Sequence, residues 1–313
     1  MSRLGQTLPL RHVEAKRELH AFDGILTTRP FETIGRQTCS SNRDMRSINT
    51  ANRLKRFPVK LGLFITLSML VACGGGGGGA VESTVPPPVD NASPGGFWVG
   101  FDNDGETVLV FATETGRFQF MTGDGAQGPG VLSVSNGNNI SGDFQLVTQV
   151  GFSFSDGSTQ SNCTLSGTVV ERQTMSVTAN CTTSLGSQDQ ITVMPLAYQD
   201  VYERDSSLAT VSGLFDGGIV VTEISSDGML FAQYSINNCV ANGRVSIIDS
   251  NFNLYDVQFT VNSCTGIYDV LNGVSFAGIG ILDNTNIPEQ FVAPAVGDSS
   301  GTSVSWIVFG ERL

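Results

Sequence analysis

Histidine and lysine are missing from most of this 313-residue sequence: the last histidine is His20 and the last lysine is Lys60. Without histidine, the later chain has no Ser-His-Asp or Cys-His arrangement of the usual kind and no histidine-rich zinc site. Without lysine, it offers no Schiff base and no Ser-Lys pair. We therefore expect no catalytic residue and no cofactor, and the enzyme chemistry left open is that of paired carboxylates.

Basic residues as a whole are scarce after residue 72. Residues 73–313 contain five arginines against 24 acidic residues, so their formal charge is −19. A surface of this sign attracts divalent cations or basic partners and repels nucleic acid, whose binding needs a basic footprint. The composition therefore excludes nucleic acid as a partner.

The apolar run over residues 61–72 is too short to cross a membrane as a helix. It contains 12 residues and follows several basic ones, whereas a spanning helix needs about 20 apolar residues. A basic segment followed by a run of this length is typical of a signal peptide. An uncleaved membrane helix is the alternative.

The run ends in Leu70-Val71-Ala72-Cys73, which six glycines follow. This Leu-x-Ala-Cys pattern resembles the lipobox of bacterial lipoproteins. The resemblance implies that Cys73 becomes the first mature residue, that its thiol takes a diacylglycerol and that its amino group is acylated. Two or more chains are what stable anchoring requires. Gly74, in the place of an aspartate, implies the outer membrane, on either its periplasmic or its exterior face.

These features divide the chain into five expected segments. Counted from Met45, the lipobox cysteine is residue 29, an ordinary signal-peptide length, so residues 1–44 are expected to be an N-terminal extension outside the mature fold. Residues 45–72 are then the signal peptide. Residues 73–94 are the lipidated cysteine and a tether rich in glycine and proline. Two β units follow, over residues 95–210 and 211–313.

An internal repeat relates the two units. Gly96-Phe97-Trp98-Val99-Gly100 recurs as Gly213-Leu214-Phe215-Asp216-Gly217, and Gly116-Arg117-Phe118 recurs as Gly228-Met229-Leu230. The best match sets Cys163-x-x-x-Gly167-x-Val169 against Cys239-x-x-x-Gly243-x-Val245. The first copy is longer, which indicates an insertion of hairpins around residues 130–154.

Four cysteines follow the anchor, and an even count in an exported protein indicates disulfides. Three pairings are possible. The repeat selects Cys163 with Cys181 and Cys239 with Cys264, each closing a hairpin within its own unit. A zinc site is the alternative, but no Cys-x-x-Cys pair is present, so we expect no metal.

Strands are predicted along most of the two units. Apolar and polar residues alternate with a period of two, and glycine, asparagine or aspartate interrupts them at intervals of about 8–12 residues. Asp104-Gly105 and Asp156-Gly157 are among the turn signals, and only residues 200–209 suggest a short helix. The predicted fold is all-β, an antiparallel barrel or sandwich of two related disulfide-bearing units. Barrel closure is favoured because it hides edge strands.

Two likenesses concern the whole plan of the chain. The Gly-Phe-Trp-x-Gly stretch and Asn253-Leu254-Tyr255-Asp256-Val257 resemble uncharacterised proteobacterial lipoproteins with two such units. The lipid anchor, tether and small barrels are similar in plan to surface lipoproteins of the transferrin-binding-protein-B type. That second likeness is architectural and implies no ligand.

Three groups of residues are candidate sites, each with a structural alternative. Asp102-Asn103-Asp104-Gly105-Glu106 is either the front of a calcium loop or a polar hairpin turn, and it lacks the glutamate that completes an EF-hand. Glu203, Arg204 and Asp205 hold a cation or a hydroxyl, or are solvated charges on a short helix. Seven aromatic residues line a ligand-holding barrel or form its core: Trp98, Phe118, Phe120, Tyr255, Phe259, Trp306 and Phe309.

The function that these observations favour is that of an envelope protein held to the membrane by its N-terminal lipid. Its β units are expected to be non-enzymatic, either binding an unknown protein, glycan or small ligand or forming a structural part of the envelope. The alternative is a carboxylate-dependent, glycosidase-like hydrolase.

Overall fold

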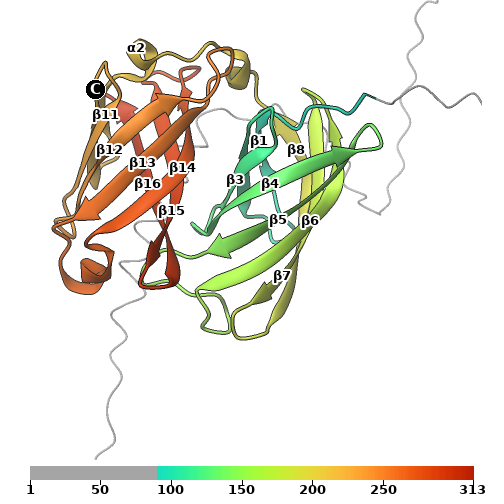
Figure 1. Cartoon of the computed structure of the whole chain (residues 1–313), viewed down its shortest axis with the longest axis horizontal. Helices are drawn as coiled ribbons and strands as arrows, with labels where there is room; N and C mark the ends of the chain where they lie inside the picture. Colours follow the sequence, from blue (N-terminus) through green and yellow to red (C-terminus); the bar gives the residue numbers. More distant parts are fainter. Residues whose placement is uncertain (1–89) are drawn as a thin grey trace, which may run out of the picture. The chain divides into compact units, whose positions relative to one another are not determined.

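Sixteen antiparallel strands form two closed barrels in the computed structural model, which describes residues 90–313 (Figure 1). Strands that follow one another in the sequence are neighbours in the sheet. The first barrel contains β1 (Gly96–Phe101), β2 (Thr107–Ala112), β3 (Arg117–Thr122), β4 (Gln127–Ser135), β5 (Asn139–Val147), β6 (Gln160–Val170), β7 (Thr174–Thr183) and β8 (Gln188–Tyr198). The second contains β9 (Gly213–Asp216), β10 (Val220–Ile224), β11 (Met229–Tyr234), β12 (Val240–Ile247), β13 (Tyr255–Asn262), β14 (Val274–Asp283), β15 (Gln290–Ser299) and β16 (Thr302–Arg312).

Closure decides between the barrel and the sandwich. β1 pairs with β8 in the first barrel, and β9 pairs with both β10 and β16 in the second. A closed barrel leaves no strand with an unpaired edge, which protects an all-β chain from pairing with other chains. The prediction of an all-β fold built from two disulfide-bearing units is confirmed, and each unit is a barrel of its own.

Alternating side chains fill each barrel. Along β11, exposed and buried residues take turns at every position, as expected for a strand with one face on a core. The seven candidate aromatic residues are all buried, with at most 7% of the surface of any of them exposed. They belong to the packed cores, which is the structural alternative stated for them.

The two barrels also share apolar contacts. Nearly every residue of β2 and β3 is buried, because the outward face of these strands is covered as well. Phe120 packs in the core of the first barrel, whereas Phe111 and Met121 join the apolar core of the second. An ion pair of 2.5 Å between Arg117 and Asp256 crosses the same boundary. Residues 90–313 accordingly fall within one compact unit.

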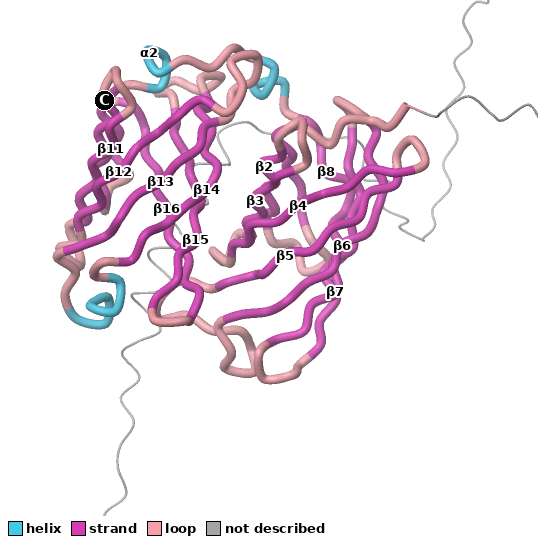
Figure 2. Tube along the Cα trace, viewed as in Figure 1, coloured by secondary structure: helices cyan, strands magenta, loops and turns pink. Residues whose placement is uncertain are grey.

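Short helices occur at two places, and loops otherwise lie at the strand ends (Figure 2). η1 (Asp200–Glu203) and α2 (Leu208–Val211) lie between the barrels, where the sequence predicts a short helix. η2 (Gly266–Leu271), between β13 and β14, is not predicted. No helix among residues 90–313 has the length and apolar character needed to span a membrane.

Both units contain the disulfide that the repeat favours. Cys163 and Cys181 face each other across β6 and β7, with their Cα atoms 4.0 Å apart. Cys239, just before β12, is joined to Cys264, just after β13.

Residues 130–154, where the sequence predicts inserted hairpins, contain β5 and most of β4. The second barrel instead has β15 and β16 after its second cysteine, so both barrels close at eight strands despite the unequal copies.

Candidate functional site

Four turns of the first barrel meet at one of its ends. In a barrel whose strands run alternately up and down, every second turn lies at the same end, so the β1–β2, β3–β4, β5–β6 and β7–β8 turns are together. They surround a cavity of about 570 Å³ that is lined by residues from all four connections. This volume lies within the usual range of small-ligand sites.

The four turns have the same local design. Each ends in a glycine with a positive φ whose N–H donates to the carbonyl oxygen three residues earlier, as between Gly105 and Asp102 (3.2 Å) and between Gly125 and Thr122 (2.9 Å). The other two turns end at Gly157 and Gly186. Glycine is favoured there because a side chain is strained at positive φ. The predicted turns at Gly105 and Gly157 are therefore confirmed.

Acidic side chains gather at this end of the barrel. Five carboxylates line the cavity, and none of the arginines that the structure describes does so; the five are Asp102, Asp104, Glu106, Asp124 and Asp189. Asp102 and Asp124 accept hydrogen bonds within their own turns, but turn geometry does not require an aspartate before the glycine. The equivalent position before the glycine is Thr115 in one turn of the same barrel and Leu185 in another. The concentration of negative charge is thus a property of the cavity mouth.

Asp156 ties two of these turns together. Its carboxylate accepts hydrogen bonds from the backbone N–H of Ser158 (2.9 Å), from the Ser158 hydroxyl (2.6 Å) and from the Thr183 hydroxyl (2.5 Å). These donors, Ser158 first, hold the pKa of Asp156 well below its usual range. The β5–β6 turn is thereby attached to the β7–β8 turn by an ionised carboxylate.

This attachment predicts a loss of stability in acid. Because the folded protein lowers the pKa of Asp156, its contribution is complete above the ordinary aspartate pKa of about 3.9 and is lost as the pH falls through the lowered value. Denaturant unfolding between pH 5 and pH 2 should show a weaker pH dependence for Asp156→Asn than for the unmodified protein. Asp269→Asn, at an exposed residue of η2, is the control and should leave the dependence unchanged. An Asp156→Asn profile parallel to that of the unmodified protein would contradict the prediction.

Apolar side chains line the cavity beside the carboxylates and several serine and threonine residues. Leu146, Phe152, Phe154 and Ile191 line it together with Ser161. Ser161 is only 3% exposed, and its hydroxyl has no hydrogen-bond partner in the described structure. A buried hydroxyl without a partner costs about 1–3 kcal/mol, so this atom calls for a polar group inside the cavity.

Residues 102–106 form a hairpin turn, one of the two alternatives stated for them. One carboxylate oxygen of Asp102 accepts from the backbone N–H groups of Asp104 and Glu106, both at 2.9 Å, which is the pattern of an Asx turn. Asn103 accepts from the backbone N–H of Thr192 (3.0 Å). Within residues 90–313, no group of three or more cysteine, aspartate or glutamate side chains is arranged to hold a metal ion.

The corresponding end of the second barrel is filled by aromatic side chains. The ring of Trp306 lies 4.8 Å from that of Tyr234 and 6.0 Å from that of Tyr268, which η2 contributes. The cavity beside these rings measures only about 50 Å³. The two barrels therefore differ at equivalent ends, one hollow and acidic, the other packed.

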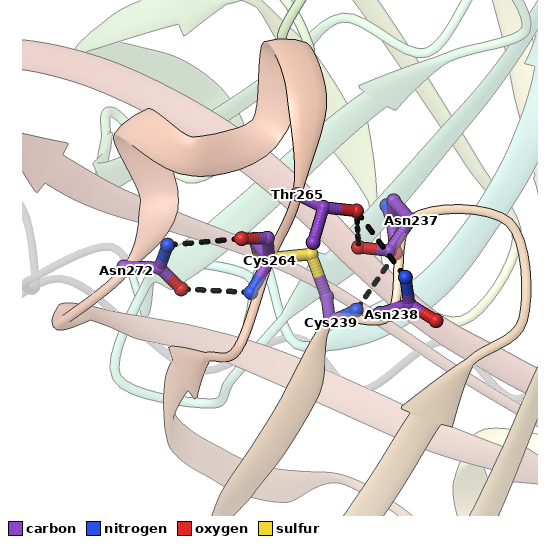
Figure 3. Close-up of a disulfide and its surroundings, with 6 residues drawn as sticks. All are labelled: Asn237, Asn238, Cys239, Cys264, Thr265 and Asn272. Carbon is purple, nitrogen blue, oxygen red and sulfur yellow. Dashed lines mark hydrogen bonds between the residues drawn. A yellow bond between two sulfur atoms is a disulfide. The ribbon is translucent and has the colours of Figure 1, made fainter.

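Hydrogen bonds around the Cys239–Cys264 disulfide hold that packed end together (Figure 3). Asn272 accepts from the N–H of Cys264 (2.8 Å) and donates to its carbonyl oxygen (3.1 Å). Asn237 accepts from the N–H of Cys239 (3.0 Å). With these side chains bonded to the backbone, the loops at this end are fixed in place.

Of the three charged residues predicted on a short helix, Glu203, Arg204 and Asp205, only the first lies in one. Glu203 ends η1, but Arg204 and Asp205 follow it in extended chain. Glu203 is not simply solvated, because it pairs with Arg172 and accepts a hydrogen bond from Tyr198 (2.5 Å). The sequence suggests one helix over residues 200–209, whereas η1 ends at Glu203.

Arg172 is a residue that sequence reasoning missed. Besides Glu203, its guanidinium binds Glu114 (2.8 Å) and the carbonyl oxygen of Gly95 (2.7 Å). It also lies 5.3–5.6 Å from three ring centres, those of Tyr198, Tyr202 and Phe252. These partners come from both barrels and from their connection, at the end of the first barrel opposite the cavity. Only the scarcity of arginine in the sequence singles it out.

Arg172→Met is expected to lower the free energy of unfolding by about 2 kcal/mol, because it leaves two carboxylates close together without their cation. Methionine keeps much of the aliphatic stem, so the loss of stability reflects mainly the removal of the positive charge. Denaturant unfolding measures it. Arg204→Met, at an arginine for which the described residues show no ion pair, should change stability by less than about 0.5 kcal/mol. Equal losses in the two variants would contradict a role for the cluster.

The lipobox and its Cys73 lie outside the described residues. No protein-family model matches the chain, and no curated protein matches its sequence.

Proposed function

We propose that this chain is a lipid-anchored, non-enzymatic binding protein of the bacterial outer membrane, and that its ligand occupies the cavity of the first barrel. The observation that carries the proposal is the contrast between equivalent ends of the two barrels. One holds a cavity of about 570 Å³ and the other a cavity of about 50 Å³. Two units with the same architecture both fold, so the fold itself does not require the larger space.

The path of the chain also supports this assignment. The segment before β1 is held at the end opposite the cavity, where Ala92 donates to the carbonyl oxygen of Gly137 (2.6 Å) and Asn91 accepts from its N–H (3.0 Å). A six-residue strand such as β1 spans about 20 Å. With an anchor at Cys73, the cavity opens on the side of the barrel away from the tether.

The anchor is tested by fractionation. Cys73→Ser removes the thiol that would carry the lipid, and we expect the variant to leave the membrane fraction for the soluble fraction of the envelope. Protease treatment of whole cells then decides between the exterior and the periplasmic face. A Cys73→Ser variant that remains with membranes would refute the anchor.

Binding is tested by a pair of variants on the same strand. A fragment library is screened against the full chain in nonionic detergent, with binding detected by ligand-observed NMR. Ser161→Leu fills the cavity with apolar volume and is expected to abolish binding of the fragments found. Ser166→Leu makes the same change on the exposed face of β6 and should preserve it. Fragments that bind both variants equally would exclude this cavity, provided that both melt as the unmodified protein does.

The same carboxylates favour one alternative function, a glycosidase-like hydrolase in which one carboxylate acts as acid and another as base or nucleophile. Its support is that several carboxylates line a single cavity. Incubation of the purified chain with envelope glycans distinguishes the two proposals. Turnover that Asp104→Asn or Asp124→Asn abolishes would establish the hydrolase and overturn the binding protein.

A further inference from the structure

We infer that the ligand of the first barrel is an aliphatic polyamine, a molecule with separated ammonium groups on methylene chains. This inference rests on the proposed function and specifies the chemistry of the same cavity. Its first support is charge: five carboxylates line the cavity without an arginine among the lining residues. Most arginines of the described chain are instead bound to acidic or carbonyl partners elsewhere, as Arg117, Arg172, Arg244 and Arg312 are.

The distribution of the carboxylates favours several separated positive charges over a metal ion. Asp102 and Asp104 lie on the β1–β2 turn, Asp124 on the β3–β4 turn and Asp189 at the start of β8. No three of the acidic groups in the described residues converge as metal ligands, and one oxygen of Asp102 is already occupied by backbone N–H groups. Hard cations need a convergent set of oxygens, whereas a polyamine needs one carboxylate near each nitrogen.

The apolar residues that line the cavity match the remainder of such a molecule. Phe152, Phe154 and Leu146 offer apolar surface to methylene groups, each of which gains from leaving water. The buried, unpartnered hydroxyl of Ser161 lines the same cavity and would accept a hydrogen bond from an ammonium group. A metal ion would use neither feature, and a neutral sugar would leave the negative charge of the cavity uncompensated.

Spermidine is the probe, and isothermal titration calorimetry of the full chain in nonionic detergent measures its binding. We expect one molecule to bind per chain. Asp104→Asn/Asp189→Asn should weaken binding at least tenfold, because it removes two of the five carboxylates that line the cavity, one from the β1–β2 turn and one from the start of β8. The control Asp205→Asn/Asp269→Asn removes the same charge from exposed residues outside the cavity and should change affinity less than twofold.

Three results would overturn the inference: no heat of binding with spermidine, equal weakening in the control, or displacement of spermidine by Mg²⁺ at equal concentration. If spermidine binding weakened equally in the control, spermidine would be attracted only by the net negative charge of the protein, an attraction that salt screens. The fragment screen separates this failure from that of the proposed function. If neutral fragments bind and Ser161→Leu abolishes their binding, the cavity is a binding site for another class of ligand. If no fragment binds either, the proposed function fails as well.

Discussion

Replacing Gly116 with alanine is expected to lower the free energy of unfolding by about 3 kcal/mol. Gly116 has a φ of +85°, and a Cβ atom there would lie 2.2 Å from the carbonyl oxygen of Leu132. The left-handed conformation costs an alanine about 1–2 kcal/mol, and relieving the overlap adds a cost of similar size. The β4 backbone cannot easily retreat, because the N–H of Leu132 donates to the carbonyl oxygen of Gly116 (2.7 Å).

Gly105 provides the matched control, since it has the same φ of +85° and open space where a Cβ atom would lie. Gly105→Ala should therefore cost only about 1 kcal/mol, the conformational part alone. Unfolding in guanidinium chloride, analysed by linear extrapolation, measures both variants. Losses of the same size would show that the close approach of β3 and β4 contributes nothing.

The internal repeat has its physical basis at this glycine. In the second barrel, Gly228 also has a φ of +85°, and a Cβ atom there would lie 2.4 Å from the carbonyl oxygen of Val245. Val245 donates to Gly228 (2.7 Å) just as Leu132 donates to Gly116. The sequence shows this echo because the turn tolerates little besides glycine.

The same comparison corrects one part of the repeat. The cysteine motif aligns β12 with β6, whereas the contacts of Gly228 align β12 with β4. Strand position in a barrel is set by pairing across the sheet, and a short motif does not report it. The copies therefore share local turns and disulfides without a strand-by-strand correspondence.

Two strands are poorly marked in the sequence because each contains a proline. β8 includes Pro195 and β15 includes Pro294, and a proline inside an apolar run argues against a strand since it cannot donate to the ladder. Pro195 fits because the pairing of β7 with β8 shifts register between Met175 and Val177. Such a bulge depends on the partner strand and is not readable from β8 itself.

The candidate site was predictable only in pieces. The sequence marks Asp104-Gly105 and Asp156-Gly157 as turns, since Asp-Gly has a local conformational preference. That these turns meet Asp124, Asp189 and Ser161 at one cavity follows from the number of strands and the closure of the barrel. Closure depends on pairing between strands far apart in the sequence. A local pattern therefore identifies the acidic turns but does not predict that they meet at one cavity.

Removing both disulfides is expected to have the largest effect on stability. The bridges close loops with sequence separations of 18 and 25 residues, and in the chain-entropy model each such loop contributes about 3 kcal/mol. The two together contribute about 6 kcal/mol, against a total stability of about 5–15 kcal/mol for a typical domain. Each paired Cys→Ala variant should therefore lose about 3 kcal/mol in denaturant unfolding, and the fourfold variant about twice that.

The second bridge should also have a local effect that the first lacks. Cys264 begins the loop that contains η2, whose Tyr268 packs against Trp306. Hydrogen exchange should accelerate around residues 264–272 in Cys239→Ala/Cys264→Ala, whereas Cys163→Ala/Cys181→Ala removes a bridge between two residues already paired in the sheet. The control is reduction of the unmodified protein with dithiothreitol. Reduction should lower the stability by as much as the four Cys→Ala substitutions do together. Full stability after verified reduction would show that the barrels do not depend on oxidation, and would remove the argument that the fold suits an oxidising compartment.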